Sequence, residues 1–181
     1  EAGEGTGAGS LATVCGLALV LVAGLIGAAE LHDNSFLTHL ATGRWLHAGN
    51  WSKLWMGNAD PYLWTSGGRT WVVQSWLASA AYDTAERVGG AAAIRMLVSC
   101  TCMALTWCLW RLSTPGRTLV PRVIAVGGAV SIGGTVWSER PMTFGLLFLA
   151  LSLLAAEGRL GTRWLLLVGW AWVNVHGSFP L

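Results

Sequence analysis

The chain has 181 residues, of which 54% are hydrophobic and only 11% are charged, and its mean hydropathy is +0.54. Soluble domains carry about 25% charged residues, so this composition is typical of a membrane protein. A net charge of +2 without a block of lysines and arginines excludes a protein that follows a nucleic-acid backbone.

The first apolar run predicts a membrane-spanning helix. Residues 11–29 contain no charged side chain, and a helix of that length is about 28 Å long, close to the bilayer core of ~30 Å. The small residues at 27–29 leave a cleaved signal peptide as an alternative. Residues 1–10, however, contain no lysine or arginine to form its positive region.

The long polar connection over residues 30–90 contains two amphipathic segments. Apolar side chains recur at helical spacing in residues 36–45 and again in residues 74–88, where Gly89 and Gly90 end the predicted helix. Each segment is too short or too polar to span a membrane and suits a helix in the interface. Tryptophan, which favours that interface, is concentrated here: Trp45, Trp51, Trp55, Trp64, Trp71 and Trp76.

Four further apolar runs complete the predicted fold. We predict an all-α polytopic transmembrane helical bundle, a single domain over residues 1–181 with about five spans and an external loop at 30–90. The predicted spans are 11–29, 91–112, 120–137, 141–157 and 163–181. Several uncharged cores are only 15 or 16 residues long, so flanking residues or local bilayer thinning must complete those spans.

The charges in the short connections predict a topology. Residues 111–122 contain three arginines and no acid, and residues 157–163 contain two arginines beside one glutamate. The positive-inside rule places both connections in the cytoplasm. Asp33, the Glu139–Arg140 turn and residues 174–176 then meet at the outer face, where grouped ionisable residues predict a functional site.

Four strings of the sequence resemble a class of bacterial polytopic membrane enzymes. They are HDNSFLTHLATGRWLHAGN, DPYLWTSGGRTWVVQSWL, SERPMTFGLLF and WAWVNVHGS. Together they are similar to the GT-C superfamily, which includes the protein O-mannosyltransferases and the aminoarabinose transferases. The similarity extends over residues 11–181.

The resemblance implies a fold of many transmembrane helices with interfacial helices in the first external loop. It also implies transfer of a sugar from a polyprenyl-phosphate donor at the outer face of the bacterial plasma membrane. Asp33 matches the first acid of the family's Asp-x-Asp or Asp-Glu element, but Asn34 and Ser35 follow where the second acid would stand. Family members run to several hundred residues, so we expect this chain to be the N-terminal part of a longer one.

Asp33 and Arg140 are the principal candidate residues. A carboxylate near the acceptor hydroxyl can act as general base, and Asp33 is assigned that catalytic role. The alternative is that Asp33 caps the helix that begins near Phe36. Arg140 is assigned to the donor phosphate, because a guanidinium offers forked donors and stays charged. Alternatively, Arg140 anchors its span at the interface, paired with Glu139.

Five more residues are candidates for binding the donor or substrate: His176, Asn174, His39, Asp60 and Gln74. His176 and Asn174 suit hydrogen bonds to phosphate or sugar, although a lone histidine is more often simply buried. Asp60 and Gln74 belong to the family-like strings, but an aspartate followed by proline also suits a turn.

No metal site is predicted from the histidines, because His32 and His39 are not spaced as ligands on one helical face. The missing second acid also weakens the case for a divalent cation. The only cofactor-like molecule that the resemblance implies is the polyprenyl-phosphate sugar, as donor substrate.

The leading hypothesis is a GT-C-type membrane glycosyltransferase that performs hexosyl or pentosyl transfer in the cell envelope. Its expected partners are membrane lipid, the lipid-linked sugar and protein subunits of a complex, but no nucleic acid. The second hypothesis is a non-catalytic membrane subunit of GT-C-like fold that serves assembly or lipid binding. A transporter has less support, because the sequence shows no internal repeat and no matching pair of broken helices.

Overall fold

The computed structural model describes residues 4–56, 58–59, 62, 70–116 and 118–179, and these are almost entirely helical. The elements are α1 (Glu4–Gly27), α2 (Asn34–Trp45), a π-helical turn (Leu46–Asn50), α3 (Lys53–Met56), β1 (Asn58–Ala59), β2 (Thr70–Trp71), α4 (Trp76–Leu112), α5 (Leu119–Gly133), α6 (Pro141–Ala156) and α7 (Trp164–Val175). The all-helical prediction is therefore confirmed. The short antiparallel pair of β1 and β2 was not predicted.

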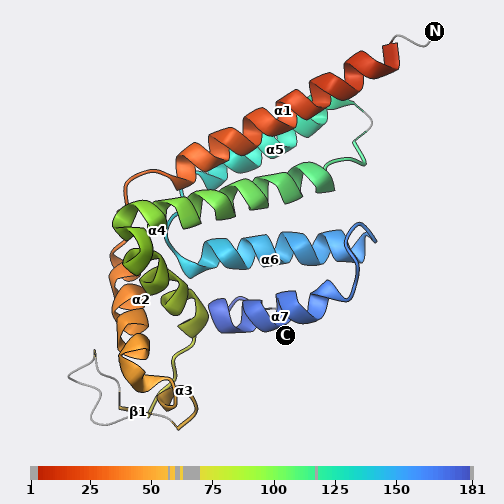
Figure 1. Ribbon diagram of the computed structural model, residues 1–181. Helices are drawn as coiled ribbons and strands as arrows, with labels where there is room; N and C mark the ends of the chain where they lie inside the picture. Colours follow the sequence, from red (N-terminus) through yellow and green to blue (C-terminus); the bar gives the residue numbers. More distant parts are fainter. Residues whose placement is uncertain (1–3, 57, 60–61, 63–69, 117, 180–181) are drawn as a thin grey trace.

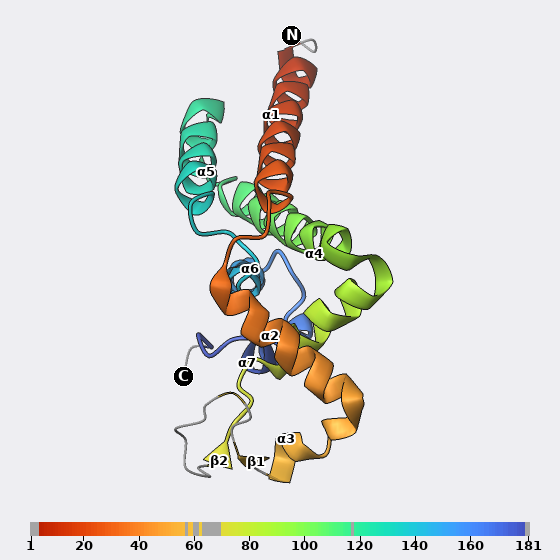
Figure 2. The ribbon, with the colours of Figure 1, turned by 90° about the vertical axis from the view of Figure 1, so that its left-hand side faces the viewer.

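The helices form two groups (Figure 1). α1, α5, α6, α7 and the second part of α4 run side by side, while α2 and the first part of α4 cross one end of that bundle. Turned by 90°, the molecule shows α3 and the two strands beyond the C-terminal end of α2 (Figure 2). The two amphipathic segments of the sequence are thus the two elements that cover one end of the bundle.

A bend in α4 separates its two parts. Gly90 has a φ of 60°, a left-handed conformation that glycine adopts without steric cost, and Gly89 beside it is also non-helical. The predicted end of the second amphipathic helix lies at these two glycines. The helix is interrupted at Gly89 and Gly90, and a second helical part begins directly after them and runs in a new direction into the bundle.

A second small core joins α2 to the first part of α4. The rings of Phe36 and Tyr82 meet edge to face with centroids 5.1 Å apart, and Leu40 is buried beside them. Gly43 permits this approach, because a Cβ there would lie 2.1 Å from the carbonyl oxygen of Ser79. The position of α2 across the bundle therefore depends on a glycine at residue 43.

The bundle core is apolar, and much of its outer surface is apolar too. Buried residues from α1, α4, α5 and α6 form one cluster: Ala23, Val98, Cys102, Leu105, Val126, Val130, Ala150 and Leu154. On the outside, Leu25 of α1 and Leu166 of α7 are largely exposed. α1 and α4 are each long and apolar enough to cross a membrane, whereas α5, α6 and α7 are shorter apolar helices.

Two helices end earlier than the predicted spans. α5 ends at Gly133, whose carbonyl oxygen accepts the backbone N–H groups of Val136 and Trp137 at 2.8 and 2.7 Å in a turn. α7 ends at Val175, after which the chain turns back so that Trp172 Nε1 donates to Ser178 Oγ at 3.1 Å. Both helices therefore close with local turns inside the predicted spans 120–137 and 163–181, and residues 180–181 lie outside the described residues.

Candidate functional site

Asp33 lies in the short connection between α1 and α2 and caps α2. Its Oδ1 accepts the backbone N–H of Ser35 at 2.8 Å and the hydroxyl of Ser35 at 2.6 Å. These bonds satisfy a backbone donor that the first turn of a helix leaves free. The helix-capping role that the sequence offered as the alternative for Asp33 is therefore present in the fold, and it occupies one of the two carboxylate oxygens.

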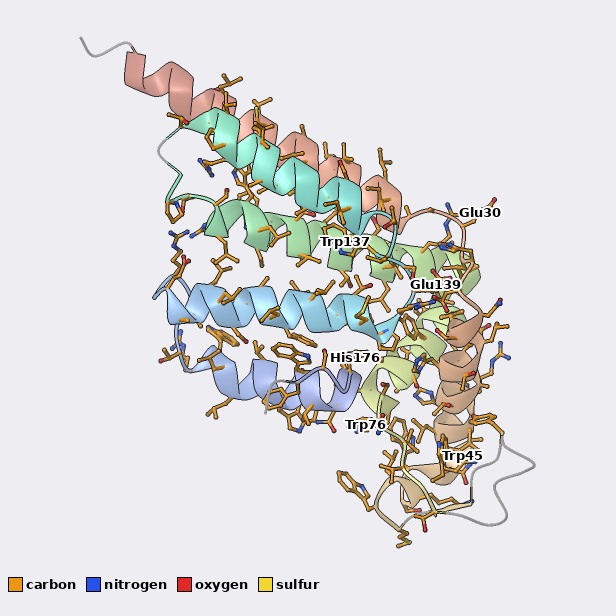
Figure 3. The ribbon with its side chains drawn as sticks, turned by 180° about the vertical axis from the view of Figure 1, so that it is seen from behind. Glu30, Trp45, Trp76, Trp137, Glu139 and His176 are labelled. Carbon is orange, nitrogen blue, oxygen red and sulfur yellow. The ribbon has the colours of Figure 1, made fainter. Side chains whose placement is uncertain are left out.

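Glu139 holds the backbone on which Asp33 sits. Its Oε1 accepts the backbone N–H groups of both His32 and Asp33, each at 2.6 Å, and the residue is buried. Figure 3 shows Glu139 at the end of the bundle that α2 covers, near Glu30. The sequence singled out Glu139 only as the neighbour of Arg140. Its role as hydrogen-bond acceptor for the backbone N–H of Asp33, 106 residues earlier in the chain, was not predicted.

Arg140 forms an ion pair with Asp33, in which Nε donates to Oδ2. Among the described residues, the ion pair of Arg140 is with Asp33 and not with Glu139, whose Oε1 accepts the backbone N–H groups of residues 32 and 33. Burial by itself would raise the pKa of Asp33, but the hydrogen bonds from Ser35 and Arg140 outweigh burial and lower that pKa to about 2. Asp33 is therefore a carboxylate whose negative charge the protein stabilises strongly.

Two clefts meet at Arg140. The first, which we call the Asp33 cleft, has a volume of about 380 Å³ and is lined by residues of the α1–α2 and α5–α6 connections: His32, Asp33, Asn34, Ser35, Thr135, Val136, Ser138, Arg140 and Met142. The second, the histidine cleft, has a volume of about 310 Å³ and is lined by Ser35, His39, Gln74, Ser75, Arg140, Pro141, Met142, His176 and Gly177. Four of the residues selected from the sequence thus border one cleft, and a fifth, Asp33, lies in the cleft next to it.

The two histidines of the histidine cleft come from opposite sides of it. Nδ1 of His39, a residue of α2, lies 3.2 Å from the hydroxyl oxygen of Ser79. Burial is the main cause that lowers the pKa of His39, and the nearby His176 lowers this pKa further. His176 follows α7, and its Nδ1 accepts the backbone N–H of Ser178 at 3.1 Å. The neutral His176 ring therefore carries its proton on Nε2, which leaves one N–H donor for a ligand.

The remaining candidates separate into two groups. Gln74 precedes α4 and lines the histidine cleft. Asn174, by contrast, uses its amide within the protein: its Oδ1 accepts from Trp76 Nε1 at 2.7 Å and its Nδ2 donates to the Trp170 carbonyl at 2.7 Å. Asn174 thus connects α7 to the start of α4, and Asp60 lies outside the described residues.

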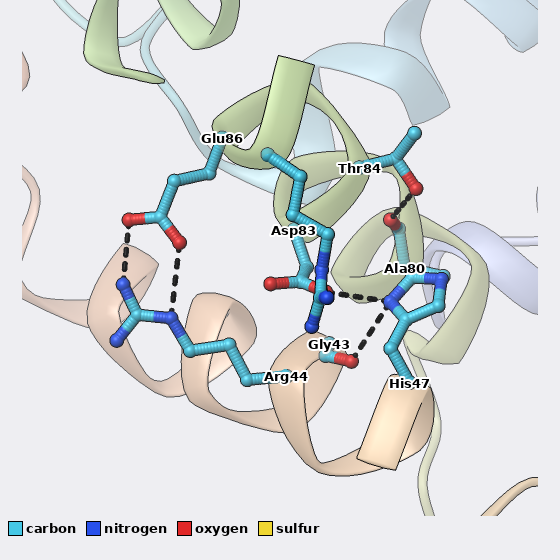
Figure 4. Close-up of polar contacts among 8 residues, drawn as sticks. Gly43, Arg44, His47, Ala80, Asp83, Thr84 and Glu86 are labelled. Carbon is cyan, nitrogen blue, oxygen red and sulfur yellow. Dashed lines mark hydrogen bonds and ion pairs between the residues drawn. The ribbon is translucent and has the colours of Figure 1, made fainter. Parts of the chain in front are cut away.

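A second polar cluster between α2 and α4 was not anticipated (Figure 4). Asp83 is only 1% exposed, and its Oδ2 accepts from His47 Nδ1 at 2.6 Å and from Arg87 Nε at 2.7 Å. Arg44 pairs with Glu86 through two hydrogen bonds of 3.0 and 2.5 Å. The signal in the sequence was the four-residue spacing of Asp83 and Arg87, which brings an acidic and a basic side chain to one face of a helix.

Within the described residues no group of three or more histidine, cysteine or acidic side chains is arranged to hold a metal ion. Comparison of the chain with models of known families, with curated proteins and with solved structures finds no match.

Proposed function

We propose that the chain is a membrane glycosyltransferase that moves a sugar from a polyprenyl-phosphate donor to an acceptor hydroxyl at the outer face of a bacterial plasma membrane. The contact between Asp33 and Arg140, 107 residues apart in sequence, carries the proposal. It brings together a carboxylate, the type of group that acts as a general base once it is free, and a guanidinium suited to bind phosphate. The proposal also rests on the resemblance of four sequence strings to the GT-C superfamily.

The proposal places five spans in the membrane: α1, the part of α4 after Gly90, α5, α6 and α7. Exposed leucines such as Leu25 and Leu166 support it, because a leucine side chain in water lacks the stabilisation of about 1.5–3 kcal/mol that full burial in an apolar environment gives. The 12 residues of α7 extend only about 18 Å, so bilayer thinning is part of the proposal for this helix.

Charge at the two ends of the bundle supports the proposed orientation. At the end away from α2, Arg159 Nη1 donates to the carbonyl of Arg111, and Arg122 stacks on Trp110 at 4.2 Å from the ring centroid. At the other end lie Asp33, Glu139 and His176. The positive-inside rule gives most weight to short connections, so the end with Arg111, Arg122 and Arg159 is cytoplasmic in the proposal and the two clefts are external.

In the proposed reaction, the acceptor O–H group lies in the Asp33 cleft and the donor phosphate lies in the histidine cleft. The acceptor oxygen forms a bond to the anomeric carbon of the sugar, and its proton passes to the Asp33 carboxylate. The bond between that carbon and the phosphate oxygen breaks, and its electron pair stays on polyprenyl phosphate. Arg140, with N–H donors from His39, Gln74 or His176, stabilises the leaving phosphate.

An apolar groove supports access of the donor from the lipid. It has a volume of about 310 Å³ between α4, α5 and α6, and its lining includes Leu105, Ile132 and Trp137. Trp137 is three residues before Arg140, so the polar clefts and the groove share the α5–α6 connection. A polyprenyl chain in the groove would keep its phosphate close to that connection.

A second candidate function is a non-catalytic membrane subunit of the same architecture. The observation that favours it is the state of Asp33, whose two oxygens are both engaged by Ser35 and Arg140. Asn34 and Ser35 in place of a second acid also favour this candidate.

The experiment compares the full chain with its Asp33→Asn variant in liposomes that contain polyprenyl-phosphate mannose or polyprenyl-phosphate arabinose. Release of polyprenyl phosphate is measured with water or a sugar as acceptor. We expect the variant to lose a factor of about 100 or more, as for removal of a general base. The control is Glu86→Gln, which alters an ion pair with Arg44 and lines neither cleft. Equal rates for Asp33→Asn and wild type would overturn the assignment, and no release by the wild type would favour the subunit.

A further inference from the structure

The carboxylate of Asp33 is not available to a substrate in this structure. Oδ1 accepts two hydrogen bonds from Ser35, and Oδ2 accepts one from Arg140. The Asp33 side chain is 4% exposed, whereas that of Arg140 is 55% exposed. A general base must reach the proton that it removes. Some group must therefore move before Asp33 can act, and the exposed guanidinium is the one with freedom to do so.

The side chain of Arg140 borders two clefts, the histidine cleft as well as the Asp33 cleft. Among the residues that the structure describes, its guanidinium uses only Nε, so the terminal N–H groups remain for a ligand. A phosphate matches the forked donors of a guanidinium at least as well as a carboxylate does. An anion in the histidine cleft can therefore bind these terminal N–H groups first, and by turning the side chain toward that cleft it breaks the bond from Nε to Asp33.

Asp33 would keep its place without Arg140. Glu139 fixes the backbone N–H groups of residues 32 and 33, and Ser35 remains bonded to Oδ1. The two contacts that position Asp33 are thus separate from the contact that neutralises it. Removal of Arg140 changes the charge around the carboxylate while its location stays the same.

We propose that Arg140 switches Asp33 between two states. In the empty site Arg140 forms an ion pair with the ionised carboxylate. A phosphate group bound in the histidine cleft draws the guanidinium away and leaves Asp33 free to act. The inference rests on the proposed function, because it makes the base available only when the donor is bound. It predicts that donor binds before acceptor.

The charges around Asp33 determine the direction of the change. Besides Arg140, it faces Glu139 from the α5–α6 connection, His32 from its own segment, His39 from α2 and the Tyr82 hydroxyl from α4. When Arg140 leaves, the nearest fixed charge is the negative Glu139. The pKa of Asp33 then rises from about 2 toward its ordinary value of 3.8, which makes the carboxylate a better base.

The test follows the ionisation of Asp33 directly, by carbon NMR of the full chain labelled at the aspartate side-chain carboxyls. The labelled aspartates are Asp33, Asp60 and Asp83, and the Asp33→Asn variant identifies the signal of Asp33. The titration midpoint is measured with no ligand, with farnesyl phosphate, with farnesol as its uncharged counterpart and with inorganic phosphate. Phosphorus NMR reports how much of each phosphate is bound.

We expect farnesyl phosphate to raise the midpoint and farnesol to leave it unchanged. If inorganic phosphate raises the midpoint as farnesyl phosphate does, the phosphate group itself is the ligand. If inorganic phosphate leaves the midpoint unchanged, the ligand is a lipid phosphate. In Arg140→Gln the midpoint should be high without ligand and insensitive to farnesyl phosphate. Arg140→Lys keeps the charge and should retain a low midpoint, and Arg44→Gln, which removes another ion pair, should behave as wild type.

The inference is overturned if farnesyl phosphate does not bind, or if it binds and the Asp33 midpoint stays where it was. A low midpoint in folded Arg140→Gln would also overturn it. These measurements involve no turnover, so they are separate from the transfer assay. If Asp33→Asn transfers sugar at the wild-type rate while Asp33 still responds to phosphate, only the catalytic role of Asp33 fails.

Discussion

The Oε1 atom of Glu139 lies 2.6 Å from the backbone nitrogen of Asp33, and the next residue, Arg140, binds the Asp33 side chain. Two successive residues before α6 thus hold the backbone and the side chain of one residue before α2. This arrangement makes the α5–α6 connection the element on which the geometry of the site depends.

Replacement of Glu139 by alanine should destabilise the protein. Two partly buried backbone N–H groups, of His32 and Asp33, would lose their acceptor, and the cost should lie below the roughly 1–3 kcal/mol of each fully buried unsatisfied donor. Glu139→Gln keeps a side-chain oxygen and should lose much less. Thermal unfolding in detergent measures both variants, and equal midpoints for Glu139→Ala and wild type would contradict the role of Glu139.

Gly43→Ala should separate α2 from α4. The added Cβ would lie 2.1 Å from the Ser79 carbonyl oxygen and 2.7 Å from the Cβ of Asp83, so the helices must move apart. Overpacking of this kind costs about 1–3 kcal/mol, which a lowered unfolding temperature would report. The control is Gly128→Ala in α5, where a Cβ meets nothing within 4 Å and where alanine favours the helix. A Gly43→Ala protein as stable as this control would show that the close approach is not needed.

Of the two polar contacts that the first part of α4 makes with α2 and with the π-helical turn, the buried one should matter more. Asp83 is 1% exposed and accepts from His47 and Arg87, so Asp83→Asn should cost about 1–3 kcal/mol. The pair of Arg44 and Glu86 is exposed, and Glu86→Gln should cost about 0–1 kcal/mol. Chemical denaturation of the two variants under the same conditions gives the comparison. The prediction fails if Glu86→Gln proves the more harmful.

Stability should fall in acid through Asp33. Because its pKa is lowered from 3.8 to about 2 in the folded chain, the contribution of Asp33 is fully present above its unfolded pKa. That contribution is lost as the pH falls through the folded pKa. Unfolding followed from neutral pH down to about pH 2 should therefore show a steeper loss for wild type than for Asp33→Asn. Parallel curves for the two proteins would mean that Arg140 and Ser35 do not stabilise the ionised carboxylate.

The sequence predicted the helices well because each depends on local features. Apolar runs gave α1, α5 and α6 to within a few residues at most ends, and helical spacing after Asp33 gave α2. The paired glycines at 89 and 90 marked the bend in α4. The C-terminal ends of α5 and α7 were not predicted, because turns at Gly133 and after Val175 close these helices before the apolar run stops.

The candidate site was predicted as a set of residues but not as a set of contacts. His39, Gln74, Arg140 and His176 do line one cleft, yet the amide of Asn174 is used by Trp76 and Trp170. Nothing in the local sequence distinguishes an asparagine bonded to a tryptophan from one that faces a ligand. The buried Asp83 cluster was missed for the same reason, since its partners come from two helices.

By itself, the sequence determined that the chain is helical and that polar groups gather at the ends of its apolar runs, because both follow from side-chain polarity along a few neighbouring residues. Only the tertiary structure decided that Arg140 pairs with Asp33 and not with the adjacent Glu139. Neighbouring side chains at the start of a helix point in different directions, so the partner of each depends on which other segment packs there. Here α2 crosses the end of α6, and that crossing places Asp33 against Arg140.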